Sequence, residues 1–331
     1  MTVCLVIVCA PALGKTWQPT AGHTQMPLWP GTPPDAKVLP GPETVTVRGG
    51  DLVAGKPWKA VTNVGQPTLT VYAPRGHNTG AAVVVFPGGG FQVLAIDLEG
   101  TEVCRWLTSI GVTCVLLKYR VPSAPYDWHC KCYNHGADAV SLPALQDAQR
   151  AIRLVRADAA DWHINPHKVG VIGFSAGGYL VGEVSADFAH PSYAPIDAAD
   201  AQSDRPDFAM AIYPGHMVSH QYLAKHDGVK PGSLNPHIRF SRQTPPTFIV
   251  QAEDDPEDSI YSSLVYYEGL IKAGVPAELH IYAKGAHAFG LRRTALPITR
   301  WPVLAATWLH TIGVLRSPHA DSGAIGAGDG P

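Results

Sequence analysis

Segments of strand length alternate with segments of helical periodicity from about residue 68 to residue 312, and no other feature restricts the fold as strongly. Residues 81–86 form a continuous apolar run with three valines, ended by a proline and three glycines. Such a run is typical of a parallel strand buried on both faces. The same criteria predict strands at 68–72, 113–119, 168–174, 208–213, 247–251 and 277–282, and helices at 99–109, 144–157, 260–271 and 301–312. The alternation predicts an α/β fold, with a mostly parallel central sheet and helices on both faces.

The domain organisation follows from where this alternation begins, stops and is interrupted. The chain has 331 residues, no linker-like segment and a hydrophobic fraction of 46%, which together suit one large domain. We expect this domain at 68–316, after an extension with the first strands at 15–67. Loop or cap insertions are expected near 122–143 and 185–244. Residues 317–331 are rich in Gly, Ala, Ser and Asp, and we expect them to be disordered.

The N-terminal segment has the features of a targeting signal. Residues 2–13 are almost wholly apolar but too short to span a bilayer, and a small-x-small triplet at 12–14 follows. We therefore expect residues 1–14 to be the remnant of a signal peptide, which implies a secreted or periplasmic protein. The basic n-region is missing, and a buried N-terminal strand in a cytoplasmic protein is the alternative.

The charge balance limits the classes of partner. The chain has 25 Lys and Arg against 27 Asp and Glu, so its formal net charge is −2. This gives no electrostatic case for binding nucleic acid or an anionic membrane. The sequence does not indicate an oligomeric state.

The segment Gly173-Phe174-Ser175-Ala176-Gly177 joins the predicted strand 168–174 to helix-like sequence. It matches G-x-S-x-G in the strand–turn–helix context that the motif requires. On such a turn the serine is exposed in a strained backbone conformation, and glycines two positions away avoid a collision. An ordinary glycine-rich turn is the alternative, but the preceding strand favours a nucleophilic Ser175.

A nucleophilic serine needs a base, and the base needs an acid that orients it. On this strand–turn–helix architecture the acid and then the histidine follow the serine along the chain. His287 lies in a glycine-flanked loop just after the last predicted strand, whereas His280 lies within that strand and is interpreted as structural. The acid is expected in the loop after strand 247–251; we favour Asp255, with Asp258 and Asp254 as alternatives.

The glycine-rich segment 87–91 follows the strand at 81–86 and precedes the serine. Backbone amides there can stabilise a negatively charged intermediate, and the candidate donors are the amides of Gly89, Gly90 and Ala176. A phosphate-binding loop is the competing interpretation. It is disfavoured because no Lys-Ser/Thr pair follows and no G-x-G-x-x-G pattern is completed.

Together these motifs resemble the α/β-hydrolase superfamily, and most closely the bacterial esterases related to hormone-sensitive lipase and to carbohydrate acetyl and feruloyl esterases. The resemblance runs from about residue 68 to 315 and is carried by segments 85–91, 170–178 and 273–280. It implies the α/β-hydrolase fold and a serine esterase that forms an acyl-enzyme and needs no cofactor. By the same resemblance Asp255 matches the acid of the catalytic triad.

The resemblance also implies the substrate class, namely small-molecule or carbohydrate esters such as acetylated or feruloylated sugars. Phe91 and Phe174, next to the glycine-rich loop and the serine, are expected to contact the substrate. Two departures stand out: Pro87 replaces a histidine that is frequent in the family, and the acid loop after Asp255 lacks the usual valine. A peptidase of the same fold and a non-catalytic binding member are the rival interpretations. The first usually needs an extra domain, and the second would have lost part of the site.

The cysteines are too few for a disulfide scaffold in a chain of this length. Cys104 and Cys114 lie in apolar segments and are expected to be core residues. The segment 129–135 contains two histidines, Cys130 and Cys132, but the C-x-C spacing is tighter than a usual zinc motif and no second ligand pair is evident. A surface loop is the favoured interpretation, with no metal, and a zinc site or a local disulfide remains an alternative.

Overall fold

The computed structural model of this chain describes residues 16–122, 126–127, 132–133, 141–219 and 232–315. The predicted signal segment 1–14 and the tail 317–331 lie outside these residues. None of the helices in the described part combines the length and the apolar character that a bilayer span requires.

A central sheet of eight strands organises the described residues, in the order β1-β4-β7-β5-β10-β11-β12-β13. All pairs from β7 to β13 are parallel, whereas β1 and β4 pair antiparallel at one edge. The strands are β1 Gln25–Pro27, β4 Thr68–Tyr72, β5 Ala82–Phe86, β7 Thr113–Lys118, β10 Val169–Phe174, β11 Ala209–Ile212, β12 Thr247–Ala252 and β13 Ala277–Tyr282. The expectation of a mostly parallel sheet is confirmed.

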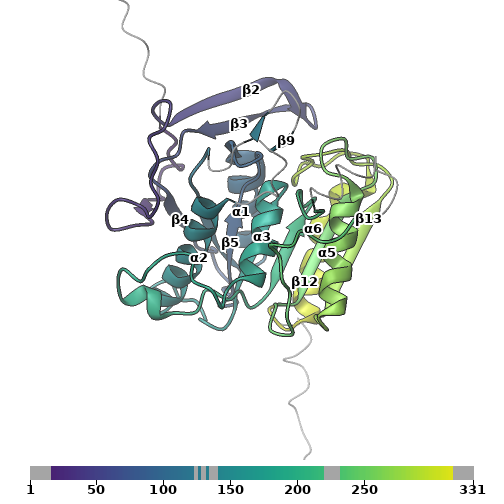
Figure 1. The fold of residues 1–331 in the computed structure, drawn as a ribbon. Helices are drawn as coiled ribbons and strands as arrows, with labels where there is room; N and C mark the ends of the chain where they lie inside the picture. The colour runs from purple at the N-terminus through teal and green to yellow at the C-terminus, as the bar shows by residue number, and fades with distance from the viewer. Residues whose placement is uncertain (1–15, 123–125, 128–131, 134–140, 220–231, 316–331) are drawn as a thin grey trace, which may run out of the picture.

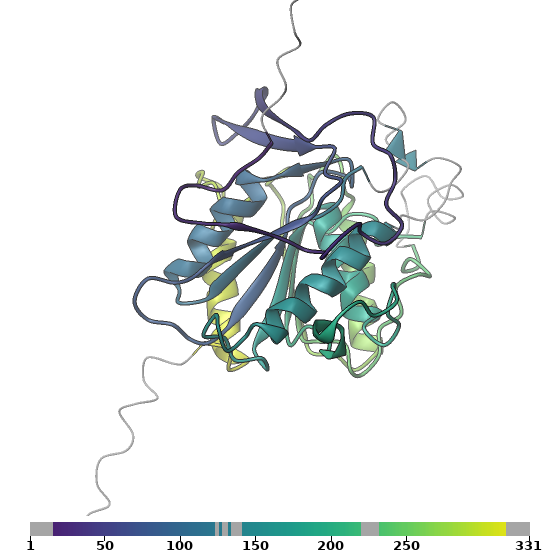
Figure 2. The same ribbon diagram turned by 90° about the vertical axis from the view of Figure 1, so that its left-hand side faces the viewer.

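Helices cover both faces of this sheet. Figure 2 shows α1 (blue) and α6 (yellow) on one face and α2, α3 and α5 (teal to green) on the other. Their bounds are α1 Glu102–Ser109, α2 Leu142–Ala157, α3 Ala176–Ala186, α5 Ile260–Lys272 and α6 Trp301–Thr311. Strands β5, β7, β10, β11 and β12 are buried at every position, which explains why their sequences are apolar without alternation.

The predicted elements match these bounds to within two residues, with one exception. The helix expected at 99–109 begins as a π-helical segment, Asp97–Thr101, and continues as α1. Of the insertion expected at 122–143, the structure describes the short strands β8 Tyr126–Asp127 and β9 Cys132–Tyr133 and then the start of α2. The insertion expected at 185–244 contains the end of α3, a 3-10 turn at Ala198–Ala201 and β11, and residues 220–231 lie outside the described part.

A second, three-stranded antiparallel sheet is formed by β2 Thr44–Val53, β3 Lys56–Thr62 and β6 Val93–Ala95. The hairpin of β2 and β3 comes from the N-terminal extension and lies across the top of the molecule in Figure 1. The sequence predicts strands in this extension but does not give their bounds. The pairing of β3 with β6 brings the hairpin next to the glycine-rich loop that precedes β6.

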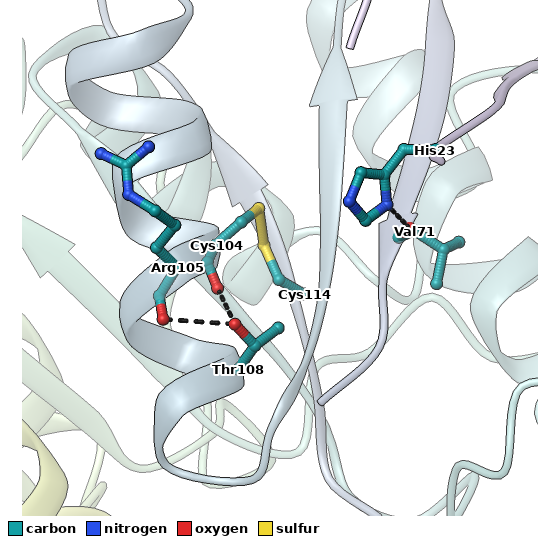
Figure 3. The surroundings of a disulfide bond; sticks show 6 residues. All are labelled: His23, Val71, Cys104, Arg105, Thr108 and Cys114. Atoms are coloured by element: carbon teal, nitrogen blue, oxygen red, sulfur yellow. Dashed lines mark hydrogen bonds between the residues drawn. A yellow bond between two sulfur atoms is a disulfide. The ribbon is translucent and has the colours of Figure 1, made fainter. Parts of the chain in front are cut away.

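Cys104 and Cys114 join α1 to β7 through a disulfide, with their Cα atoms 5.1 Å apart (Figure 3). Both residues are buried, as expected for core positions. Treating them as two separate core residues was incomplete, because the helix and the strand bring them into contact. The two residues are only ten positions apart, so the covalent link closes a short loop.

We expect that replacing both cysteines by alanine lowers the free energy of unfolding by about 2–3 kcal/mol, the range expected for a short closed loop. Denaturant unfolding of the oxidised wild type, the reduced wild type and the double variant measures this. The double variant should be insensitive to reductant, since its stability no longer depends on this link. Peptide mapping under non-reducing conditions that found both thiols unpaired would contradict the prediction.

Candidate active site

Ser175 occupies the sharp turn between β10 and α3. Its backbone has φ 52° and ψ −119°, a conformation that residues other than glycine rarely adopt. The residue is the N-cap of α3, at the carboxyl end of a parallel strand. Its strained conformation matches the turn that the G-x-S-x-G pattern predicts.

Close backbone packing explains the two glycines of the motif. A Cβ atom at Gly173 would lie 2.0 Å from the carbonyl oxygen of Gly177, and a Cβ atom at Gly177 would lie 2.1 Å from that of Phe86. Both distances are far below any tolerated contact. The turn that presents Ser175 therefore forms only with glycine at these positions.

His287 connects Ser175 to Asp255. Its Nε2 atom lies 3.0 Å from Ser175 Oγ, and its Nδ1 atom lies 2.8 Å from Asp255 Oδ2. The three residues come from the loops after β13, β10 and β12. The structure thus brings together the nucleophile, base and acid that sequence analysis expected, in the geometry that activates a serine.

The Asp255 carboxylate is fully buried and accepts four hydrogen bonds. Oδ1 accepts from the backbone N–H groups of Glu257 and Asp258, and Oδ2 accepts from Gln251 Nε2 and His287 Nδ1. These contacts fix the carboxylate so that one oxygen faces the imidazole. Among the alternatives left open by the sequence, Asp255 is the residue positioned to orient His287.

Asp254, one of those alternatives, supports the histidine loop instead. Its Oδ1 accepts hydrogen bonds of 2.8 Å from the backbone N–H groups of Gly285 and Ala286. Ala286 and Ala288, on either side of His287, both have φ above +50°. The carboxylate thereby helps to hold a strained loop that directs the imidazole toward Ser175.

Asp258, the other alternative, lies on the nucleophile side of the imidazole. Its Oδ2 is 3.3 Å from Ser175 Oγ and 3.8 Å from His287 Nε2, so it does not contact Nδ1. Two carboxylates therefore flank the histidine, one at each ring nitrogen. Asp258 does not have the position of a residue that orients the base.

The charge state of His287 reflects these surroundings. Burial lowers its pKa, but the hydrogen bond to Asp255 and the charges of Asp258, Asp255 and Glu99 outweigh burial and raise the pKa to about 9. The carboxylates act by stabilising the imidazolium form.

Glu99 and Tyr213 form a buried link that sequence analysis missed. Glu99 accepts a hydrogen bond from the backbone N–H of Gly88 (2.7 Å) and another from the Tyr213 hydroxyl (2.8 Å). The Tyr213 hydroxyl in turn accepts from Gly290 N, and its ring packs against His287 with centroids 5.0 Å apart. Burial raises the pKa of Glu99. The link joins the glycine-rich loop to the histidine loop.

A signal for one of these residues was present in the sequence. Tyr213 directly follows β11, at the edge of the sheet where the parallel strands end and where ligands bind in such folds. Glu99 had no comparable signal, because a carboxylate at the start of a helix is usually exposed.

A pocket of about 910 Å³ opens over Ser175 and His287. Gly89 and Gly90 line it, and Ala176 directly follows the serine at the start of α3. The outer wall comes from the β2–β3 hairpin, including Trp58, and Asp258 and His216 also face the pocket. The three candidate oxyanion donors therefore lie in or next to the pocket.

The expected substrate contacts of Phe91 and Phe174 are wrong. Both side chains are completely buried and neither lines the pocket. Phe91 packs edge-on against Tyr119 and Tyr179, and Phe174 packs against Tyr213 and Trp301. Closeness in sequence to the site did not indicate the direction of these side chains, because alternate positions of a turn or strand face opposite ways.

Among the described residues, no group of three or more His, Cys, Asp and Glu side chains has an arrangement that holds a metal ion. The histidine and cysteine segment 129–135 lies outside those residues, apart from the two positions of β9.

Two curated proteins are similar to this chain in sequence. The chain is 30% identical over 240 residues to an acetylxylan esterase of Xylanibacter ruminicola, covering 68% of this chain and 44% of that protein. It is 24% identical over 241 residues to endo-1,4-beta-xylanase B of Butyrivibrio fibrisolvens, covering 67% of this chain and 34% of that protein. The chain thus spans less than half the length of the curated relatives it matches.

A solved structure covers more of this chain, and a family model matches its central part. The acetyl ester-xyloside bifunctional hydrolase of Caldicellulosiruptor lactoaceticus superposes with a TM-score of 0.65 at 29% identity, covering 88% of this chain and 97% of that one. Residues 83–291, which include Ser175, Asp255 and His287, match the family model described as alpha/beta hydrolase fold. This chain therefore belongs to the alpha/beta hydrolase fold family.

Proposed function

We propose that this protein is a serine carboxylic-ester hydrolase in which Ser175, His287 and Asp255 form the catalytic triad. The observation that carries this proposal is the continuous contact from Ser175 Oγ to His287 Nε2 and from His287 Nδ1 to Asp255, at 3.0 and 2.8 Å. A serine that faces the pocket, a base and an orienting acid are the parts that acyl transfer to serine requires.

In the acylation step Ser175 Oγ attacks the ester carbonyl carbon while its proton moves to His287 Nε2. The resulting tetrahedral intermediate carries its negative charge on the former carbonyl oxygen. The intermediate then collapses: the bond from carbon to the alcohol oxygen breaks, and His287 transfers its proton to that oxygen. The alcohol leaves, and the acyl group stays on Ser175.

In the deacylation step water attacks the acyl-enzyme carbonyl and gives a proton to His287. The bond to Ser175 Oγ then breaks, and the proton returns to the serine oxygen as the carboxylic acid leaves. Asp255 keeps the Nδ1 proton in place, so that Nε2 stays available as the base. Backbone N–H groups of Gly89, Gly90 and Ala176 are the proposed donors to the oxyanion in both steps.

The substrate we propose is a short-acyl or aromatic ester of a carbohydrate. The relatives named for acetylxylan and acetyl ester-xyloside hydrolysis support an acetyl ester of a plant polysaccharide fragment. A pocket of about 910 Å³ is larger than an acetyl group needs, which leaves space for a bulky alcohol such as a sugar.

The proposal is tested by assaying purified protein with 4-nitrophenyl acetate, longer-chain 4-nitrophenyl esters, acetylated xylo-oligosaccharides and a peptide anilide. We expect hydrolysis of the acetyl esters, slower turnover of long chains and none of the anilide. Cleavage of the anilide at a comparable rate would favour a peptidase of this fold. Folded protein that hydrolyses no ester would exclude the proposal and favour a non-catalytic binding protein.

We further propose that the protein is exported to an oxidising compartment, by secretion or to the periplasm. The Cys104–Cys114 disulfide supports this, because such bonds are rare in reducing cytoplasm. Cell fractionation of a host that expresses the coding sequence, with the N-terminus of the product determined, tests it. Full-length protein found only in the cytoplasm would contradict it.

The raised pKa of His287 predicts an alkaline activity profile. His287 acts as a base only when neutral, so kcat/KM should rise with pH until the pH exceeds a pKa of about 9. The measurement is kcat/KM for an acetyl ester from pH 6 to pH 10, corrected at each pH for the rate with a Ser175→Ala variant. A profile already flat from pH 6 upward would show that the imidazole is neutral throughout.

A further inference from the structure

Asp258 is a second carboxylate at the reacting atoms, and the triad does not need it. Its Oδ2 lies 3.3 Å from Ser175 Oγ and 3.8 Å from His287 Nε2, and the residue lines the pocket. Asp255 already occupies the other side of the imidazole. The role of Asp258 is therefore separate from orienting the base.

The surroundings of Asp258 hold its carboxylate in this place. Its backbone N–H donates to Asp255 Oδ1, and its carbonyl accepts from Gln251 Nε2. On the opposite side Gly215 leaves room for the side chain, since a Cβ atom there would lie 2.5 Å from Asp258 Oδ1. A side chain fixed by its backbone and fitted against a glycine can act on a ligand with little loss of entropy.

A carboxylate in this position has an electrostatic cost for simple ester hydrolysis. Negative charge develops on the substrate next to Ser175 during the reaction, and a second negative group nearby opposes it. The cost is offset if the substrate brings a hydrogen-bond donor to the carboxylate. An ester of a simple alcohol has no such donor, whereas an ester of a sugar has hydroxyl groups on the neighbouring carbons.

We propose that Asp258 selects esters whose alcohol carries a free hydroxyl group next to the esterified oxygen. This inference rests on the proposed ester hydrolysis and specifies the alcohol. The leaving oxygen must lie near His287 Nε2 to receive its proton, and Asp258 Oδ2 is adjacent to that position. A hydroxyl on the neighbouring carbon is then within reach of Oδ2 and donates to it. Asp258 is thus a specificity-determining residue on the alcohol side of the pocket.

The test compares two esters that differ in one hydroxyl group: the monoacetate of trans-1,2-cyclohexanediol and cyclohexyl acetate. We expect the wild type to favour the hydroxy ester in kcat/KM by about 10- to 100-fold, as for a hydrogen bond to a charged group. Asp258→Asn should remove most of this preference. The preference is the ratio of the two kcat/KM values measured with the same enzyme. A change in the pKa of His287 affects both esters equally and therefore cancels in this ratio.

Glu253→Gln is the matched control, because Glu253 is an exposed residue on the same loop and its replacement removes the same charge. It should retain the wild-type ratio. Equal hydrolysis of the two esters by the wild type overturns the inference, and this comparison does not depend on whether the variant folds. An Asp258→Asn enzyme that keeps the full preference, with kcat/KM unchanged or lowered by the same factor for both esters, also overturns the inference. Only failure of the wild type to hydrolyse any ester, 4-nitrophenyl acetate included, contradicts the proposed function itself.

Discussion

Ser175→Ala is expected to lower kcat for 4-nitrophenyl acetate by about 10⁶-fold, the size of loss that removal of a serine nucleophile causes in a triad enzyme. The variant keeps His287 and the backbone amides but has no atom that can form the acyl-enzyme. Alanine has the same Cβ atom as serine, so the strained backbone at φ 52° is unchanged and the fold should persist. Initial rates with high enzyme concentration, together with the melting temperature, measure both expectations.

Ser185→Ala is a suitable control for Ser175→Ala, since Ser185 is a buried serine further along α3 and away from the pocket. It should keep the wild-type rate. An organophosphonate should label the wild type at Ser175 and leave Ser175→Ala unlabelled, as mapped by mass spectrometry. A Ser175→Ala enzyme with more than a few per cent of wild-type activity would show that another group is the nucleophile.

The parts of this molecule that the sequence predicted correctly are those determined by local backbone geometry and chain order. Gly173 and Gly177 are required by contacts within the turn itself, so the motif is visible without knowledge of the rest of the fold. His287 follows from its position after the last strand, because the carboxyl ends of parallel strands meet at one edge of the sheet. Neither inference needs side-chain contacts between distant segments.

The parts that could not be predicted depend on packing between segments far apart in the chain. Glu99 meets Tyr213 across 114 positions, and the β2–β3 hairpin reaches the pocket from the N-terminal extension. The loop after β12, which carries the acidic residues, also could not be resolved from the sequence, because its contacts depend on a second loop. Its carboxylates at 254, 255 and 258 have three different partners, and which one faces His287 depends on the loop after β13.

Asp255→Asn is expected to lower kcat by about 10⁴-fold, through the wrong tautomer of His287. Oδ1 of Asp255 accepts from two backbone N–H groups, of Glu257 and Asp258, so the amide oxygen of the asparagine must take that place. The NH₂ group then faces Nδ1 and donates to it. The imidazole carries its proton on Nε2 instead, and it can no longer accept the proton of Ser175.

The comparison of Asp255→Asn with Asp258→Asn decides between the two carboxylates. With 4-nitrophenyl acetate, which has no hydroxyl group in its alcohol part, Asp258→Asn should cost far less than 10⁴-fold. Asp255 still holds Nδ1 of His287, and Nε2 remains 3.0 Å from Ser175 Oγ, closer than the 3.3 Å between Ser175 Oγ and Asp258 Oδ2. The kcat of Asp255→Asn should also not increase between neutral and higher pH, since deprotonation of the imidazolium does not restore the tautomer with its proton on Nδ1. If Asp258→Asn proved the more damaging of the two, the acid of the triad would be Asp258, and the hydrogen bond at Nδ1 would have only a structural role.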